Sequence, residues 1–513
     1  LLNNAGATVS FGGGGLVIGT TTGTGLEATG GGTVTVTGAG NTIVSAGAAA
    51  LRVENTTIGA SGLSFRSISA SGGANGIVLV NTGALNGLQV TGTGAAGSGG
   101  TISGIVGADG STEGIGVYLQ DARNVHLSYM ALADADNFVV RGVDVSGFSL
   151  DNSVVSGTSG TNAALAEGAV SFAGLTGSAT INGSQVSGGL TDNVSVSNAS
   201  GTLNRLTISG STIGLNGTAT GDDGVFIDAT GTAVVNVTVQ NSTFAGARAD
   251  LFQLGLSNTA VSDLVFSGNT LNNGHSSPLS GGGGVLVSGT GNPSLTYAVT
   301  GNAVRGTTGA ALAVIKGAGT GSFTGTVSNN VVGQSGVANS GSSQGSGIIV
   351  DLAGGGTHTA SVTGNQVFQF TNFGIRSQAG TTASGGQGVL KVVVQGNTVS
   401  EPSPNAVAGA FPTHGIRIQS GITTGDNAIV CATVGGAGAL ANSVTGTGSN
   451  GGTDIRLFER FLTTMALPGY LGAPNDNVAA AAFAQANNGG TPTVQATNNV
   501  SAGGPGFVGT CPA

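Results

Sequence analysis

One six-residue pattern recurs along most of the chain and constrains its fold more than any other feature. The pattern reads apolar, any residue, Gly or Asn, Asn or Ser, any residue, apolar. Its fourth positions follow one another at intervals of 27 to 45 residues, which is too even for chance and too uneven for a strict repeat. The copies are Leu150–Val155, Ile181–Val186, Ile208–Ile213, Val239–Phe244, Phe266–Leu271, Val299–Val304, Val327–Val332, Val362–Val367 and Val394–Val399, with a weaker copy at Ala439–Val444.

A second pattern lies between these copies and consists of Gly followed by alternating Val or Ile. It occurs at Gly224–Ile227, Gly284–Val287 and Gly347–Val350, each time 18 residues before the fourth position of a six-residue copy. The two patterns together predict three short strands per repeat: one after the Gly, one ending at the six-residue pattern, and one just beyond it.

These patterns favour parallel coils over antiparallel hairpins. Hairpins would show two-residue Asn-Gly loops at intervals of about 8 to 12 residues, whereas the period here is near 30 residues. In a solenoid, each coil buries its inward side chains against the coils on either side. We therefore predict an all-β fold, a right-handed parallel β-helix (solenoid) with about three short strands per coil.

The fourth positions are expected to occupy corners between strands. Gly and Asn tolerate the positive φ that such corners often need, and Asn or Ser side chains can satisfy turn backbone groups. Stacked coil upon coil, these side chains would form a polar turn ladder. The predicted ladder residues are Ser153, Ser184, Ser211, Ser242, Asn269, Asn302, Asn330, Asn365 and Asn397, with Asn442 following in the weaker copy.

The C-terminal segment departs from the repeat. Asp454–Leu462 is rich in charge, and Asp476 can cap the N-terminus of a short helix over Asn477–Ala486, which Gly489 and Gly490 would end. Because the last coil of a solenoid exposes an unpaired strand edge, a structured cap is expected there. We therefore predict a β-helix over residues 1–450 and a capping segment over 451–513.

Composition excludes several classes of protein. The 513 residues include 99 Gly, 39% apolar and only 7% charged residues, which does not fit a disordered chain. A net charge of −9 argues against nucleic acid as a partner, and no uninterrupted apolar run of membrane-spanning length occurs. The chain begins at Leu1 without Met or a signal peptide, so we expect Leu1 to be a processing point in a longer precursor.

The two cysteines, Cys431 and Cys511, have no CxxC spacing and do not suggest a zinc site. A disulfide between them would tie the C-terminal tail to the last coils and stabilise the fold by about 4 kcal/mol in the chain-entropy model. Two buried thiols are the alternative. The disulfide would require an oxidising compartment.

These features resemble the right-handed parallel β-helix repeat proteins of bacteria and the passenger segments of secreted or autotransported surface proteins. The likeness lies mainly in Leu203–Ser211 through Asp250–Leu254, and in Leu467–Tyr470, Asn475–Asn477 and Gly506–Cys511. It extends over nearly the whole chain and implies secretion and a role outside the cell or at the bacterial cell surface. It does not specify an activity, since β-helices carry many functions.

The best catalytic candidates are Asp222 and Asp223, which precede a predicted strand. Adjacent carboxylates on a β-helix resemble part of the polygalacturonase pattern, in which paired acids act on a glycosidic bond. That family also needs a nearby His-Gly and an Arg-Ile-Lys. Here the only His-Gly is His414-Gly415, far along the chain, and Arg-Ile-Lys is absent. The alternative is that both acids shape a turn.

Asp134 and Asp136 alternate as acids do in a calcium loop, but the EF-hand Gly and terminal Glu are missing. A solvated turn is the alternative, and no cofactor is expected.

We therefore expect an extracellular structural or adhesive β-helical protein rather than an enzyme. Its partners would be other copies of itself, stacked head to tail, or glycans and proteins of a surface or matrix. The alternative is a polysaccharide-active enzyme, a glycoside hydrolase or lyase, on the same scaffold. A third hypothesis places ligand recognition in the loops at 155–165 and 333–346.

Overall fold

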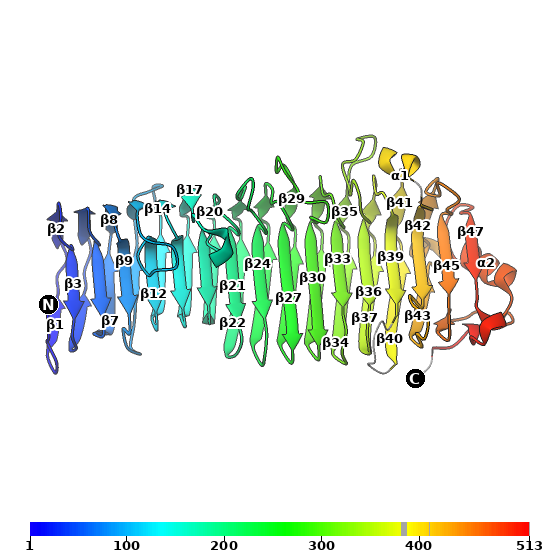
Figure 1. Cartoon of the computed structure of the whole chain (residues 1–513), viewed down its shortest axis with the longest axis horizontal. Coiled ribbons are helices and arrows are strands. Elements are labelled where there is room, and N and C mark those ends of the chain that lie inside the picture. Colours follow the sequence, from blue (N-terminus) through cyan, green and yellow to red (C-terminus); the bar gives the residue numbers. More distant parts are fainter. Residues whose placement is uncertain (381–386, 410, 512–513) are drawn as a thin grey trace. The chain divides into compact units, whose positions relative to one another are not determined.

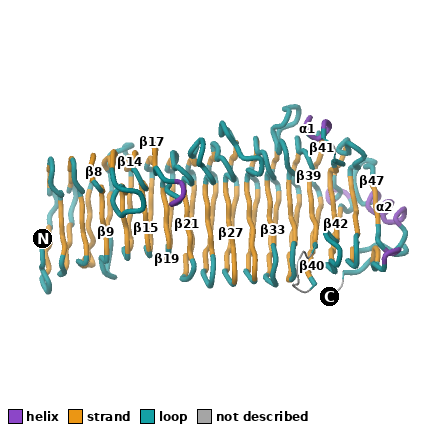
Figure 2. The backbone as a smooth tube through the Cα atoms, viewed as in Figure 1, coloured by secondary structure: helices purple, strands orange, loops and turns teal. Residues whose placement is uncertain are grey.

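The computed structural model describes residues 1–380, 387–409 and 411–511. Short parallel strands follow one another along the chain and belong in turn to three sheets, here named A, B and C (Figures 1 and 2). The chain divides into two compact units. The first unit comprises Leu1–Asp228, Ala233–Arg248 and His275–Ser277, and the second comprises Ala229–Thr232, Ala249–Gly274 and Pro278–Ala513.

In the first unit, each sheet gains one strand per coil. Sheet A contains β3 (Leu26–Thr29), β6 (Leu51–Glu54), β9 (Asn75–Val80), β12 (Ile115–Gln120), β15 (Phe138–Val143), β18 (Val170–Ala173), β21 (Val194–Asn198) and β24 (Val225–Ala229). Sheet B contains β1 (Thr8–Phe11), β4 (Thr33–Val36), β7 (Thr57–Phe65), β10 (Leu88–Val90), β13 (Arg123–Ser128), β16 (Ser146–Asp151), β19 (Thr176–Asn182), β22 (Thr202–Ser209) and β25 (Val234–Gln240). Sheet C contains β2 (Val17–Thr20), β5 (Thr42–Ala46), β8 (Ser67–Gly73), β11 (Gly100–Ile105), β14 (Met130–Ala135), β17 (Val154–Ser159), β20 (Gln185–Val186), β23 (Thr212–Ile213) and β26 (Thr243–Phe244).

The second unit repeats this arrangement. Sheet A contains β27 (Phe252–Asn258), β30 (Val285–Gly291), β33 (Leu312–Lys316), β36 (Ile348–Leu352), β39 (Phe373–Ala379), β42 (His414–Ser420), β45 (Ile455–Glu459) and β47 (Val494–Thr497). Sheet B contains β28 (Val261–Ser267), β31 (Ser294–Thr300), β34 (Ser322–Ser328), β37 (Gly356–Thr363), β40 (Gly388–Gln395), β43 (Ile429–Val434), β46 (Thr464–Ala466) and β48 (Gly506–Val508). Sheet C contains β29 (Thr270–Asn272), β32 (Ala303–Arg305), β35 (Val331–Val332), β38 (Gln366–Val367), β41 (Thr398–Ser400) and β44 (Ser443–Thr445).

The predicted fold class, a parallel β-helix with three short strands per coil, is confirmed. The coil around Asn302 illustrates the agreement in detail. Its first strand, β30, follows Gly284, its second strand, β31, ends two residues before Asn302, and its third strand, β32, begins directly after Asn302. Each strand pairs in parallel with its counterpart in the next coil.

The core consists of columns of apolar side chains that repeat in register from coil to coil. In sheet B of the second unit, one column contains the first residues of successive six-residue copies, all nearly inaccessible to solvent. Its members are Phe266, Val299, Val327, Val362 and Val394. The six-residue pattern therefore begins with an apolar residue because that side chain points into the coil.

Two glycine positions show why glycine is needed in the six-residue pattern and at the start of the second pattern. Gly301, directly before Asn302, has a φ of +67°, which L side chains rarely adopt. Gly347 directly precedes strand β36 of sheet A, and a Cβ there would lie 2.3 Å from Val367 Cγ1 and 2.6 Å from Gly374 O. The first glycine is needed for its backbone angle and the second for the close approach of the neighbouring coil.

The C-terminal end contains the predicted helix, α2 (Asn477–Ala486), which is confirmed with its bounds. The Asp476 carboxylate accepts a hydrogen bond from Ala479 N at 2.9 Å and caps the helix as expected. The strands β45 to β48 lie beyond residue 450 and still pair in parallel with earlier strands, so the proposed boundary between residues 450 and 451 stays a prediction.

A second short helix, α1 (Pro404–Ala408), precedes β42. In the part of the chain that the structure describes, no helix is long and apolar enough to cross a membrane.

Candidate ligand-binding groove

Arginine side chains form a column on the outer face of sheet A in the second unit. Strand alternation turns every second residue of β39, β42, β45 and β47 outward, while Ile375, Ile416 and Ile455 are fully buried. The parallel register aligns Arg376 with Arg417, Arg417 with Arg456, and Arg456 with Gln495. Neighbouring strands lie about 4.8 Å apart, so three guanidinium groups follow one another on adjacent coils.

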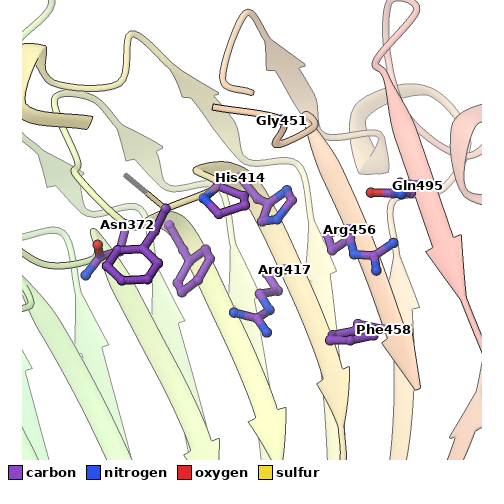
Figure 3. Close-up of a pocket in the computed structure, with 10 residues that line it drawn as sticks. Asn372, His414, Arg417, Gly451, Arg456, Phe458 and Gln495 are labelled. Atoms are coloured by element: carbon purple, nitrogen blue, oxygen red, sulfur yellow. The ribbon is translucent and has the colours of Figure 1, made fainter. Parts of the chain in front are cut away.

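A groove of about 420 Å³ opens over this column (Figure 3). No carboxylate is among the residues that line it. Its lining residues are Asn372, Phe373, Phe411, Pro412, His414, Arg417, Gly451, Arg456, Phe458 and Gln495.

The three arginines of the column differ in their partners. Arg376 forms an ion pair with the buried carboxylate of Asp351, with an Nη2 to Oδ2 distance of 2.5 Å. Arg417 Nη2 donates to the neutral side chain of Gln419. Among the described residues, neither Arg417 nor Arg456 has a carboxylate at ion-pair distance, and Arg417 Nε and Arg456 Nη1 are buried without a hydrogen-bond acceptor. Arg376 Nε is likewise buried without an acceptor. Arg417 and Arg456 differ from Arg376 because they line the groove and have no carboxylate partner in the described part of the chain.

Aromatic rings hold these guanidinium groups in place. The Arg417 guanidinium lies 4.8 Å from the centre of the Phe373 ring, and that of Arg456 lies 4.6 Å from the Phe458 ring. The Phe373 and His414 rings stack with an interplanar angle of 7°. Phe411 forms a further wall of the groove and is 81% exposed, which is unusual for so large an apolar side chain.

The electrostatics of the groove reflect this crowding of positive charge. Burial and the charges of Arg376, Arg456 and Arg460 lower the pKa of Arg417 to about 10. Burial and the charges of Arg417 and Arg456 lower the pKa of His414 to about 4, so its imidazole is neutral near neutral pH. The groove is thus a positively charged, partly aromatic surface in a chain whose net charge is −9.

The sequence reasoning missed this groove, although a signal was present. An Ile-Arg pair occurs in three successive sheet A strands, at Ile375-Arg376, Ile416-Arg417 and Ile455-Arg456. The sequence alone does not align these arginines, because the segments between the three strands differ in length; the parallel register aligns them.

Asp222 and Asp223, the catalytic candidates, lie close to a third carboxylate that sequence reasoning did not identify, Asp192. One carboxylate oxygen of each residue lies within 4.8 Å of the others, and within the described chain this is the one group of three or more potential metal ligands. Asp223 N donates to Asp192 Oδ1 at 2.9 Å. Asp192 and Asp223 are buried, whereas Asp222 is exposed. Burial, opposed by the Asp223 N–H bond and reinforced by the Asp222 charge, raises the pKa of Asp192 to about 7.

Asp134 and Asp136, the metal candidates, serve turns in the structure. Asp134 Oδ1 accepts from Thr158 N at 3.1 Å, and Asp136 Oδ2 accepts from Gly107 N at 3.0 Å. Asp134 also has a φ of +51°. The two residues do not belong to a group of three or more potential ligands among the residues described.

The proposed ladder residues lie one above another within each unit and bond to one another. In the second unit, the backbone N–H of each Asn donates to the side-chain oxygen of the next, as from Asn330 to Asn365 and from Asn365 to Asn397, both at 3.0 Å. Each side-chain amide donates to the same oxygen. The series runs from Asn269 through Asn302, Asn330, Asn365, Asn397 and Asn442 to Asn488.

In the first unit, serines form an equivalent series in which each backbone N–H donates to the next hydroxyl oxygen. The members are Ser153, Ser184, Ser211 and Ser242. Asn488 was not predicted as a ladder member because it lies two residues after helix α2 and outside any copy of the six-residue pattern.

The disulfide between Cys431 and Cys511 is present, with the two Cα atoms 5.5 Å apart. It joins β43 to the segment directly after β48, so it ties the C-terminal tail to a neighbouring coil as predicted.

Comparisons with known proteins give no relative: no family model, no curated protein and no solved structure matches this chain.

Proposed function

We propose that this chain is an extracellular adhesive β-helix that attaches to a surface or matrix ligand through the groove on sheet A of its second unit. The observation that carries the proposal is the pair of guanidinium groups of Arg417 and Arg456, which line the groove on adjacent strands and have no carboxylate partner in the part of the chain that the structure describes. Like charges directly opposite one another destabilise a sheet. A binding role gives a reason for such an arrangement, because an anionic ligand would supply the missing negative charge.

The β-helix supplies a rigid support for this attachment. Both arginines of the groove lie on strands β42 and β45, which are paired with a strand on each side. The buried asparagine series fixes the corners of the same coils. Rigid presentation lowers the entropy that a binding site loses when its ligand arrives.

Secretion is part of the proposal. The disulfide would persist in an oxidising compartment, and the resemblance to bacterial passenger segments implies the same location. The protein would then act outside the cell or at the bacterial cell surface, with glycans or proteins of a surface or matrix as partners.

Attachment assays with matched variants test this proposal. Labelled chain is applied to immobilised acidic polysaccharides, neutral polysaccharides and matrix proteins. We expect Arg417→Gln/Arg456→Gln to reduce retention about tenfold or more. The control Arg66→Gln/Arg305→Gln removes two exposed arginines elsewhere and should keep wild-type retention. Equal retention of wild type and the groove variant, or no retention of wild type, would refute attachment through the groove.

Self-association is the second form that a structural role could take. Negative-stain images of the same preparations over a concentration series would test it. Filaments would assign the function to a polymer of this chain, whereas single particles at every concentration would leave the attachment role.

A polysaccharide-active enzyme is the second candidate function, favoured by one observation at Asp192, Asp222 and Asp223. A carboxyl with its pKa raised to about 7 beside an exposed carboxylate is the arrangement expected of a general acid and its partner. We rank it second because Asp192 and Asp223 are buried, which restricts access of a substrate. Glycan cleavage that is lost in Asp222→Ala would support it, and absence of cleavage by wild type would end it.

A further inference from the structure

We infer that the ligand of this groove is a linear sugar chain bearing carboxylate groups, which lies across strands β39, β42, β45 and β47. The inference rests on the proposed function and names the chemistry of the attached partner.

The charge of the groove selects an anion. Arg417 and Arg456 line it, and none of its lining residues is acidic. A guanidinium group binds a carboxylate through parallel N–H donors, and the side chains of Arg417 and Arg456 both line the groove. Arg376, on the neighbouring strand of the column, shows this kind of pairing with the Asp351 carboxylate inside the protein.

The aromatic residues select a ligand with flat apolar faces. Phe373 and Phe458 are half-buried and hold the guanidinium groups, whereas Phe411 stands 81% exposed at the wall of the groove. A sugar ring presents a face of C–H groups that packs on an aromatic ring, while its carboxylate can reach an arginine at the side. Arginine and aromatic residues together therefore favour a charged sugar over a small inorganic anion.

The position of the groove argues against an extended peptide as the ligand. Peptides commonly bind a sheet by pairing with a free strand edge. Here β39, β42 and β45 are each paired with strands on both sides, so over these three strands the face offers side chains rather than a free strand edge.

The direction of the groove fits a chain of sugars. Its lining residues come from successive coils, from Phe373 on β39 to Gln495 on β47, as Figure 3 shows for the labelled side chains. A pyranose ring is about as long as the strand spacing of about 4.8 Å. Consecutive sugars can thus meet consecutive coils, with Asn372 and Gln495 as polar contacts at the two ends.

Calorimetric titration of the full chain with the linear hexamer of mannuronic acid tests this inference. The same hexamer with every carboxylate methyl-esterified is the neutral probe. We expect the acid to bind, binding to weaken as salt concentration rises, and the ester to bind at least about tenfold more weakly. Equal binding of acid and ester, or no binding of either, overturns the inference without any need for a variant.

Variants then place the binding in the groove. Arg417→Gln/Arg456→Gln should weaken binding of the acid at least about tenfold, whereas Arg66→Gln/Arg305→Gln should leave it unchanged. Phe411→Ala should weaken it about fivefold, with Leu471→Ala, at a residue 97% exposed and outside the groove, as its control. Equal losses in the groove and control variants would mean unspecific charge attraction and would overturn the inference.

Competition separates this ligand class from its rivals. If a hexaglutamate peptide binds as tightly as the uronate, the site does not select sugars over acidic peptides. If inorganic sulfate displaces the uronate at equal concentration, the site binds simple anions. Either result overturns the inference. If attachment depends on the groove while the uronate fails to bind, only the ligand class is wrong. If the uronate binds but the groove variant attaches as well as wild type, the proposed function is wrong.

Discussion

At the residue scale, the chain places a few charges where the fold alone gives no reason for them. Arg417 and Arg456 are aligned on adjacent strands with no carboxylate at ion-pair distance among the described residues, and Asp192 is buried beside two other carboxylates. Both arrangements oppose folding, since like charges repel and burial disfavours the charged form. Such positions are where function is expected, and the groove is the one that also offers access to a ligand.

The raised pKa of Asp192 should make the free energy of unfolding depend on pH. Its folded pKa of about 7 lies above its ordinary value of 3.8, so the folded state binds the proton more tightly than the unfolded state. The free energy of unfolding should therefore fall by about 1.4 kcal/mol per unit as the pH rises from about 4 to about 7. Above pH 7 this penalty is fully present.

The comparison of wild type with Asp192→Asn isolates this contribution. Urea denaturation at a series of pH values should give curves that diverge across that window and run parallel above about pH 8. The variant should be the more stable protein near neutral pH. A constant difference between the two curves at every pH would contradict the raised pKa of Asp192.

At the element scale, the C-terminal end is held by helix α2, by the end of the asparagine series and by the disulfide. Helix α2 begins at a capping Asp476, packs Phe483 against Tyr470 with ring centres 5.8 Å apart, and is followed by Asn488, which accepts from Asn442 at the end of the asparagine series. The disulfide joins the tail to β43. The last coils are thus covered, which protects strand edges that would otherwise invite pairing with other chains.

We expect removal of the disulfide to cause a local loss of stability. Cys431→Ser/Cys511→Ser opens a loop with a sequence separation of 80 residues, which in the chain-entropy model is worth about 4 kcal/mol. Hydrogen exchange should show loss of protection in β46, β48 and α2, with β30 to β36 of the same unit unchanged. Uniform loss of protection throughout the unit would mean that the end is not a separate stabilising element.

At the scale of the whole molecule, each coil contacts mainly the coils next to it, so stability is expected to be shared between neighbours. The asparagine series makes this explicit, because each side chain bonds to the next one and also to the backbone of an earlier coil. Asn365, for example, receives from Asn330 and donates to Val327 O at 2.9 Å. Loss of one member leaves buried donors and acceptors in two coils.

Double-mutant cycles test this coupling. Asn365→Ala should lower the free energy of unfolding by about 1 to 3 kcal/mol, while Gln366→Ala, at an exposed neighbouring position, should have little effect. Asn330→Ala and Asn365→Ala should be non-additive by about 0.5 kcal/mol or more, because the two residues share hydrogen bonds. Asn302→Ala and Asn442→Ala share no partner and should add. Full additivity of the adjacent pair would refute the coupling.

The sequence by itself determined the coil. Apolar alternation, glycine or asparagine before each corner, and the buried polar corner residue are local requirements repeated in every turn, so they leave a period that can be read directly. The helix over Asn477–Ala486 and the disulfide could be predicted for similar reasons, since capping and cysteine pairing have short-range or unambiguous signals. Asp222 and Asp223 were found as neighbours in sequence, but Asp192 was not.

The groove and the three-acid group were decided only by the tertiary structure. Arg376, Arg417 and Arg456 are about 40 residues apart in sequence and align because parallel pairing sets the register between coils whose loops differ in length. Asp192 meets Asp222 and Asp223 for the same reason. Loop lengths vary without disturbing the core, so sequence spacing does not show which outward side chains share a column. The hydrogen-bonded register between the strands does.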